Sequence, residues 1–198
     1  MTRQGERGDG VVLSPYFYTH TEYQAMAATN KPIVSIIMGS TSDLPVMKKA
    51  LDLLEQMEVP FELLALSAHR TPEEVTDFAT HAEERGICVI IAAAGMAAHL
   101  CGVIAAQTTV PVIGVPIAST LSGMDALLAI VQMPGGIPVA TVGINGSLNA
   151  ALLAVQILAV ADADLAERYR SYKEGLKQKI VKANADLAEV KDYKYKTN

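Results

Sequence analysis

Short apolar runs alternate with amphipathic stretches along most of the chain, and this alternation predicts its secondary structure. Apolar runs bounded by glycine, proline or polar residues are typical of buried parallel strands. Between the runs, apolar residues recur at every third or fourth position, which is the period of a helix with one face in a core. We expect strands at residues 33–38, 61–66, 88–92, 112–115 and 138–142. We expect helices at about residues 45–57, 72–85, 99–108, 126–133 and 149–160.

The strand–loop–helix alternation predicts a three-layer α/β/α sandwich around a Rossmann- or flavodoxin-like parallel sheet of about five strands. A further amphipathic helical pattern, residues 165–187, follows the last expected helix of the sandwich. Such a helix needs an apolar partner surface, either on the core or on a neighbouring subunit, so residues 163–198 are treated as a separate C-terminal segment. Residues 31–162 then form the α/β domain. Residues 1–30 form an N-terminal extension that is flexible or reflects a misassigned start.

Composition narrows the class of protein. Hydrophobic residues make up 51% of the 198 residues and aromatic residues only 5%, without any Trp, which suits an aliphatic core between a sheet and its helices. The net charge of -5 gives no basic footprint for nucleic acid. No apolar run reaches the roughly 18 residues that a membrane span needs, and no secretory signal is recognisable. Cys88 and Cys101 form neither a disulfide framework nor a metal-ligand pattern, so we expect no metal and a reducing, cytoplasmic location.

Parallel strands end at one edge of a sheet, so the loops after the first three strands should converge there. These loops are residues 39–43, 67–71 and 93–100, with 119–125 as a candidate fourth. The first loop offers the Ser40 and Ser42 hydroxyls and free backbone N–H groups to an anion at a helix start, although the same residues also suit capping alone. It is neither a P-loop nor a dinucleotide fingerprint, because the lysine of the one and the spaced glycines of the other are missing.

The second loop places an imidazole beside a fixed positive charge, directly before a helix. Thr71 is the expected N-cap, Pro72 the first helical residue, and Glu74 the partner of Thr71 in a capping box. His69 can donate or accept a proton near neutral pH, and Arg70 has the planar fork that suits phosphate. An ordinary surface loop is the alternative interpretation.

Asp43 and the third loop complete the candidate chemistry. Asp43 would repel a phosphate, so it is either an acceptor for sugar hydroxyls or a helix N-cap. Residues 93–98 are nearly all small, which leaves an apolar space lined by backbone N–H groups or reflects tight packing of a helix on a strand. His99 either belongs to the site or bonds a loop carbonyl. Together these loops indicate a phosphorylated substrate that is anchored at one end and protonated or deprotonated at the other.

Five segments of the chain, in their order and spacing, resemble the N5-carboxyaminoimidazole ribonucleotide mutase family. They are residues 39–43, 67–72, 97–100, 121–125 and 130–138, within a resemblance over about residues 31–160. The resemblance implies a Rossmann-like sandwich, a homo-octamer with active sites at subunit contacts, a small ribonucleotide and CO2 as substrates, and no cofactor. It assigns catalysis to His69 and substrate binding to Ser40, Asp43 and Arg70. The same loops add Ser42, Ser67, Gly95, Ala97, His99 and Leu100 to the expected binding site.

The implied reaction is a decarboxylation followed by a recarboxylation in purine biosynthesis. The N-carboxylate of an aminoimidazole ribonucleotide leaves as CO2, which ring carbon C4 recaptures, and His69 carries the proton between the amine and C4. The chain departs from the family pattern at three positions. Ala93 and Met96 stand where glycine is usual, and Cys101 stands where proline is usual. Larger groups at these positions would reshape the pocket wall or shift its loop.

Three alternative functions stay open at this point. Direct carboxylation of aminoimidazole ribonucleotide with CO2 is the nearest. Family members of that kind typically carry lysine at the position of Arg70 and a changed segment 97–100, so the residues present favour the mutase. A flavodoxin-like flavin-binding electron carrier is suggested by residues 38–42, although few aromatic residues are available to sandwich a flavin. A non-catalytic assembly module would account for the last amphipathic helix without nucleotide binding.

Overall fold

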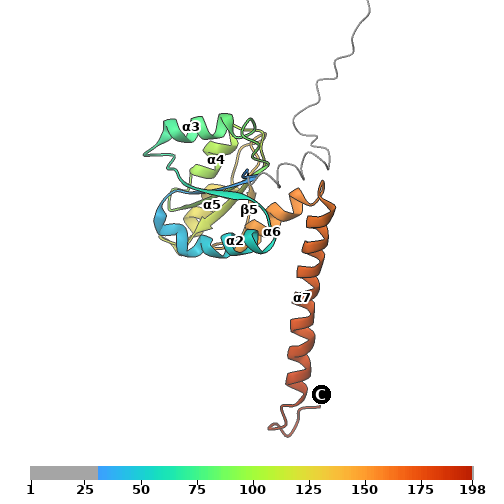
Figure 1. The fold of residues 1–198 in the computed structure, drawn as a ribbon. Helices are drawn as coiled ribbons and strands as arrows, with labels where there is room; N and C mark the ends of the chain where they lie inside the picture. Colours follow the sequence, from blue (N-terminus) through green and yellow to red (C-terminus); the bar gives the residue numbers. More distant parts are fainter. Residues whose placement is uncertain (1–30, 198) are drawn as a thin grey trace, which may run out of the picture.

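The parallel sheet predicted from the apolar runs is present and contains five strands (Figure 1). The computed structural model describes residues 31–197, so the expectation for residues 1–30 lies outside the described residues. The strands are β1 (Val34–Met38), β2 (Phe61–Ala65), β3 (Val89–Gly95), β4 (Val112–Ile117) and β5 (Ala140–Thr141). Their spatial order is β2-β1-β3-β4-β5. The direction of winding therefore reverses between β1 and β3, the kind of switch point at which open α/β sheets bind ligands.

Helices cover both faces of this sheet and complete the predicted three-layer sandwich. The elements are a 3-10 turn η1 (Thr41–Asp43), α2 (Leu44–Gln56), α3 (Pro72–His81), α4 (Leu100–Ala105), α5 (Met124–Val131), α6 (Ser147–Leu158) and α7 (Ala163–Ala188). Helices α2 and α6 and the start of α7 pack on one face, and α3, α4 and α5 pack on the other. Within residues 31–197, no helix has the length and hydropathy to cross a membrane.

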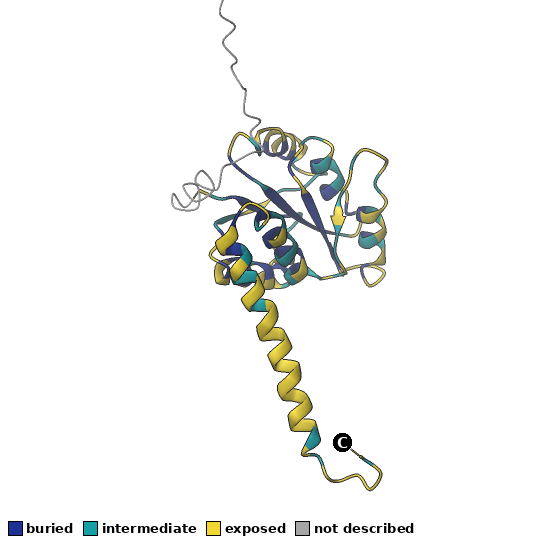
Figure 2. Ribbon diagram, turned by 90° about the vertical axis from the view of Figure 1, so that its right-hand side faces the viewer, coloured by how far each residue is buried: buried dark blue, intermediate teal, exposed yellow. Residues whose placement is uncertain are grey.

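Burial explains why the central strands read as continuous apolar runs. Every residue of β1 is buried, as are all residues of β3 except Gly95 at its end, and Figure 2 shows the strands at the centre of the sheet in dark blue. Strands covered by helices on both faces need apolar side chains at successive positions. The edge strand β2 is only partly buried, and its Leu63 is exposed.

Several elements differ in extent from those predicted. Strand β3 continues to Gly95 rather than ending at Ala92, and α4 ends at Ala105 rather than near Thr108. Strand β4 continues through Pro116 to Ile117 instead of closing at the proline. Proline lacks only a hydrogen-bond donor, and the Pro116 carbonyl still accepts from the backbone N–H of Asn145 at 2.8 Å. Strand β5 keeps only two residues of the expected run 138–142. Helix α6 begins at Ser147 rather than at Asn149.

Helix α3 begins at Pro72 with Thr71 as its N-cap residue, as predicted, but its side-chain capping and its C-terminal end differ from the prediction. The capping box is wrong: the Thr71 hydroxyl makes no cap bond to the helix, but turns back to accept from the backbone N–H of Ser67 at 2.9 Å and donate to its carbonyl at 3.2 Å. The helix ends at His81 rather than near Arg85. Gly86 closes the following turn with a φ of +88°, a conformation that glycine adopts without steric cost.

Helix α7 starts on the core and then leaves it, as Figures 1 and 2 show. The Asp162 carboxylate caps its first turn by accepting from two backbone N–H groups, each at 2.9 Å. Leu165 is fully buried, and Tyr169 and Tyr172 pack against the core formed by α2 and α6. The predicted amphipathic helix is confirmed, but its more distal apolar residues are exposed in the described chain; they are Leu176, Ile180, Val181 and Leu187.

Candidate active site

A cleft of about 540 Å³ opens at the carboxyl edge of the sheet, where the loops after β1, β2, β3 and β4 meet. The predicted convergence of three loops is therefore present, and Ser119 brings in the candidate fourth loop. All of the predicted site residues except His99 line this cleft: Ser40, Ser42, Asp43, Ser67, His69, Arg70, Gly95, Ala97 and Leu100.

The turn η1 organises the first wall through a chain of hydroxyl groups. Ser40 is its N-cap, and its Oγ accepts from the backbone N–H of Ser42 at 3.2 Å. The Ser42 hydroxyl lies 2.8 Å from Ser40 Oγ and 3.4 Å from Asp43 Oδ1. Since a hydroxyl has one hydrogen, Ser42 donates to one of these acceptors at a time. The interpretation of these serines as capping residues is confirmed for Ser40, and both hydroxyls still line the cleft.

Asp43 is an acidic group held almost out of solvent at the base of this wall. Its exposed fraction is 8%, and burial raises the pKa of its carboxyl, while hydrogen bonds to the Ser42 side chain and the Ser40 backbone lower it in part. Asp43 is the N-cap residue of α2, as one of its two interpretations predicted, but its carboxylate makes no hydrogen bond to the helix. Acceptor positions on this carboxylate therefore face the cleft and suit hydroxyl donors of a ligand.

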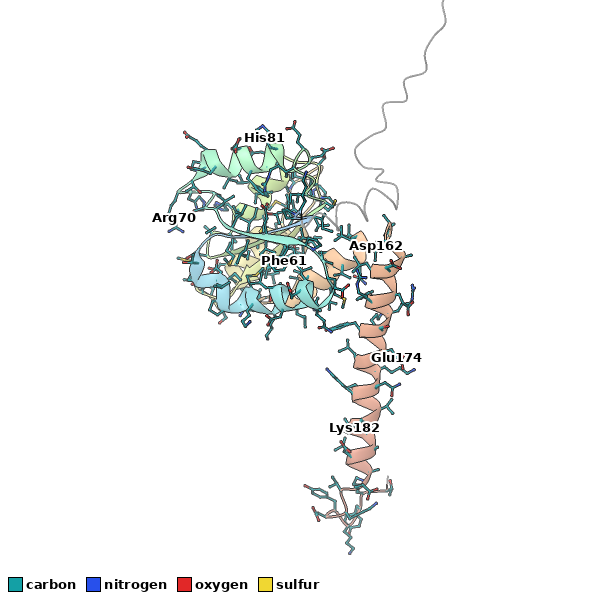
Figure 3. All side chains as sticks on the ribbon, in the orientation of Figure 1. Phe61, Arg70, His81, Asp162, Glu174 and Lys182 are labelled. Carbon is teal, nitrogen blue, oxygen red and sulfur yellow. The ribbon has the colours of Figure 1, made fainter. Side chains whose placement is uncertain are left out.

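Arg70 joins the first two loops by its guanidinium. Its Nη2 donates to the Gly39 carbonyl at 2.9 Å, and its Nε donates to Ser67 Oγ at 3.3 Å. Figure 3 shows Arg70 at the edge of the domain, with its side chain projecting from the ribbon. Guanidinium has five N–H donors, so the two bonds leave donors that can reach an anion in the cleft.

His69 and His99 come from different loops and meet at the cleft. Nε2 of His69 lies 2.8 Å from Nδ1 of His99, and the two rings stand edge to face with centroids 4.9 Å apart and planes at 80°. One ring nitrogen must donate and the other accept, so each ring restricts the tautomer of the other. His99 is thus bonded to a side chain rather than to a loop carbonyl, and it stands behind His69 rather than in the lining of the cleft.

The wall after β3 is apolar and closely packed. A Cβ added to Gly95 would lie 3.3 Å from the Ile117 carbonyl oxygen, so tight packing explains this small residue. Ala93 and Cys101 are fully buried beneath the wall, and burial raises the pKa of the Cys101 thiol to about 12. Of the three departures from the family pattern, only Met96 lies at the cleft. Its φ of +55° is in the left-handed region, where glycine is favoured.

Six lining residues are not among the predicted site residues, and four of them, Gly39, Ala68, Ala94 and Met96, lie within the three predicted loops. The other two are Ile117 and Ser119. Both follow from the extension of β4 beyond Pro116, and the only sequence signal was the candidate fourth loop at 119–125. Among the described residues, no group of three or more His, Cys, Asp and Glu side chains is placed to hold a metal ion.

Residues 33–179 match the protein family described as AIR carboxylase. This chain belongs to the AIR carboxylase family. The matching region runs from β1 into α7 and includes every residue that lines the cleft. AIR carboxylase family membership thus extends over the whole sandwich and its candidate site.

Relatives within the AIR carboxylase family carry two kinds of name. The N5-carboxyaminoimidazole ribonucleotide mutase of Pyrococcus abyssi is 58% identical over 154 residues, which are 77% of this chain and 88% of that protein. The mutase of Bacillus subtilis is 54% identical over 160 residues, 79% of this chain and 99% of that protein. The phosphoribosylaminoimidazole carboxylase of Candida glabrata is 47% identical over 187 residues, but these cover 94% of this chain and only 33% of that longer protein.

A solved structure supports the same fold. The crystal structure of Treponema denticola PurE resembles this structure with a TM-score of 0.71 at 31% sequence identity, over 79% of this chain and 98% of that chain. The five-stranded parallel sheet flanked by helices is therefore the fold of this family.

Proposed function

We propose that this member of the AIR carboxylase family is an N5-carboxyaminoimidazole ribonucleotide mutase, an isomerase of purine biosynthesis that forms 4-carboxyaminoimidazole ribonucleotide. The observation that carries the proposal is one cleft in which His69 and Arg70 face an apolar wall and a buried acid, Asp43. Relatives that are 51–58% identical over most of this chain carry the mutase name. The flavin-binding alternative has no comparable support.

Substrate binding is divided between the two polar loops. Arg70 and Ser67, already bonded to each other at 3.3 Å, present donors to the phosphate of the ribonucleotide. Ser40 and Ser42 add hydroxyl donors at the start of η1. The Asp43 carboxylate would repel the phosphate, so it accepts from the ribose hydroxyls. With the phosphate and the ribose held in this way, we expect the aminoimidazole ring to lie toward His69 and the wall formed by residues 94–97.

His69 carries the proton of the reaction. In the first step the N–carboxyl bond breaks, CO2 departs, and the bonding electron pair stays on the amine nitrogen, which takes a proton from His69. In the second step C4 attacks CO2 and forms a C–C bond, and the proton on C4 returns to His69. The reaction is balanced and consumes no cofactor. General acid–base catalysis of this kind is typically worth about 10² to 10⁴ in rate.

CO2 needs a different kind of site from the phosphate. It is uncharged between the two steps, so donors hold it weakly and an apolar enclosure holds it better. Ala94, Ala97 and Leu100 supply small or aliphatic walls beside the histidine. The same small residues leave the space that CO2 requires.

Assay with two substrates tests this function. We expect the purified protein to convert the N-carboxylated nucleotide without added bicarbonate. Formation of product only from the uncarboxylated nucleotide with bicarbonate would instead establish direct carboxylation. That alternative is considered because relatives such as the Candida glabrata protein carry the carboxylase name. Absence of any nucleotide binding would favour the assembly module.

We also propose that the enzyme works in the cytoplasm as a homo-oligomer, an octamer with active sites at subunit contacts. In this proposal residues 31–162 form the catalytic domain, and residues 163–198 contact the core and a neighbouring subunit. Exposed apolar residues on α5 and α7 support an assembly; they are Met124, Leu128, Val131, Leu176 and Ile180.

A further inference from the structure

Met96 is a large apolar residue in a backbone conformation that disfavours it. Its φ is +55°, and non-glycine residues enter this left-handed region at a steric cost. It directly follows Gly95, the last residue of β3, and its carbonyl accepts from the backbone N–H of Ala98 at 2.8 Å. Met96 therefore lies within the turn that directs the chain from β3 into α4.

Packing does not explain why a methionine stands here. The side chain is 55% exposed, whereas the neighbouring residues Ala94 and Ala98 are buried in the core between the sheet and α4. A half-exposed side chain gains little from burial, so the strained backbone is not compensated in the core. Met96 instead lies at the cleft, in the wall that also contains Ala97 and Leu100.

Met96 belongs to the same short segment as His99, the residue that contacts the proposed proton carrier His69. Three residues further on, His99 contacts His69 at 2.8 Å, so one short segment supplies both the apolar wall and the ring behind the catalytic histidine. A methionine side chain is flexible and polarizable, and it adapts to small apolar contents of a site. Glycine at the same place would remove this side chain from the lining of the cleft.

We infer that Met96 is a specificity-determining residue that covers the apolar end of the cleft and retains CO2 between the two steps. The inference rests on the proposed mutase function. Once the N–carboxyl bond has broken, CO2 either reacts at C4 or escapes to solvent and leaves the uncarboxylated nucleotide behind. The Met96 side chain determines which of these two outcomes prevails, because CO2 forms no strong polar contact that would hold it in the cleft.

The test follows the carboxyl carbon through the reaction. Substrate with an isotopically labelled N-carboxylate is converted in unlabelled bicarbonate, and the label retained in the product is compared with the amount of uncarboxylated nucleotide released. We expect the full-length wild-type chain to retain the label. In Met96→Ala and Met96→Gly, release should rise by about tenfold, the order of discrimination that roughly one methylene-sized group gives in an apolar pocket. Met96→Leu should restore retention.

The variants separate the side chain from the backbone. Met96→Ala keeps the strained φ but lacks the cover, whereas Met96→Gly loses both. Glu58→Gly is the matched control, because Glu58 has the same φ of +55° after the end of α2, outside the cleft. It should leave label retention unchanged and so exclude a general effect of relieved strain.

Three results would overturn the role of Met96. They are retention of the label in both the alanine and the glycine variants, release in the glycine variant alone, and loss of the label by the wild type during productive turnover. Release in the glycine variant alone would assign the effect to the backbone at residue 96. Loss of the label by the wild type would show that no CO2 is retained. A wild type that makes no product from the N-carboxylated nucleotide would instead contradict the proposed function itself, so the two failures are distinguishable.

Discussion

His69 Nε2 lies 2.8 Å from His99 Nδ1, so the two imidazoles of the candidate site are joined directly although their loops follow different strands. The contact fixes the ring of His69 at the cleft. It also occupies one of its two nitrogens, so Nδ1 is the ring atom of His69 left for a ligand. A residue with this placement can carry a proton without large movement.

We expect His69→Asn to abolish turnover while nucleotide binding and folding persist. Asparagine retains hydrogen-bonding capacity and approximate shape but cannot titrate near neutral pH. Calorimetry with the product nucleotide measures binding, and the absorbance change on forming the ring carboxylate measures turnover. His81→Asn, on the exposed face of α3, is the matched control and should behave as wild type. If His69→Asn keeps turnover within about tenfold of wild type, the loss is smaller than the usual acid–base contribution. His99 would then be the next candidate for the proton carrier.

Arg70→Lys should raise KM more than it lowers kcat. The guanidinium already bonds the Gly39 carbonyl and Ser67 Oγ, and its remaining donors lie in one plane, which an ammonium group cannot reproduce. Loss of one charged hydrogen bond is worth roughly 1.5 to 3 kcal/mol, so KM should increase by about tenfold or more. Steady-state kinetics over a range of substrate concentration provides the measurement. A constant KM with a reduced kcat would contradict the phosphate assignment.

The fold and the placement of the polar loops could be predicted from sequence because both depend on local pattern. The apolar runs of β1 and β3 identify strands buried on both faces, and parallel strands bring the loops that contain Ser40 and His69 to one edge. Helix and strand type are governed by the period of apolar residues. These rules need no knowledge of the contacts between distant residues.

Other features of the site depend on contacts between distant residues, or on which of two local hydrogen bonds a side chain forms. The bond between His69 and His99 joins residues 30 positions apart, and no sequence period encodes it. The Thr71 hydroxyl had two local hydrogen-bonding options, and it bonds the Ser67 backbone rather than capping α3. Ser119 reaches the cleft only because β4 extends past Pro116. The φ of Met96 likewise follows from the turn that the assembled sheet imposes.

Asp43→Asn should stabilise the folded protein at neutral pH. Burial raises the pKa of this carboxyl above its ordinary value of 3.8, so between 3.8 and the folded-state pKa the folded state binds more protons than the unfolded state. The free energy of unfolding therefore falls as pH rises through that window, and the penalty is complete above it. Asparagine avoids the penalty because it is always neutral.

Thermal unfolding across acidic to neutral pH measures this effect. The Tm advantage of Asp43→Asn should disappear as pH falls below 3.8, where the wild-type carboxyl is protonated in both states. Asp52→Asn, on the exposed face of the following helix α2, is the matched control and should change Tm little, because its ion pair with Lys48 is solvent-exposed. A Tm for Asp43→Asn below that of wild type at pH 7 would show that polar contacts to the carboxylate outweigh its burial.

Ile180→Glu should weaken the assembly of this protein. Ile180 is 66% exposed on the part of α7 that leaves the domain, one helical turn beyond Leu176. A groove of about 640 Å³ lies between the end of α2 and α7, and its lining includes Met57, Tyr172 and Leu176. We expect a helix of a second copy of the chain to cover this surface. Ile180 lies beyond Leu176 and outside the lining of this groove, and a charge buried without a partner in a subunit contact on this part of α7 is strongly unfavourable. We therefore expect light scattering to show a smaller particle for Ile180→Glu than for wild type at the same micromolar concentration.

Lys182→Glu is the control for the assembly. Lys182 is exposed on the same part of α7, as Figure 3 shows, and its substitution changes the charge without removing apolar surface. It should leave particle size unchanged. If active sites lie at subunit contacts, as proposed, the specific activity of Ile180→Glu should fall with dilution in parallel with its particle size. A monomeric wild type would contradict the assembly, and an active, fully dissociated Ile180→Glu would show instead that one chain holds a complete site.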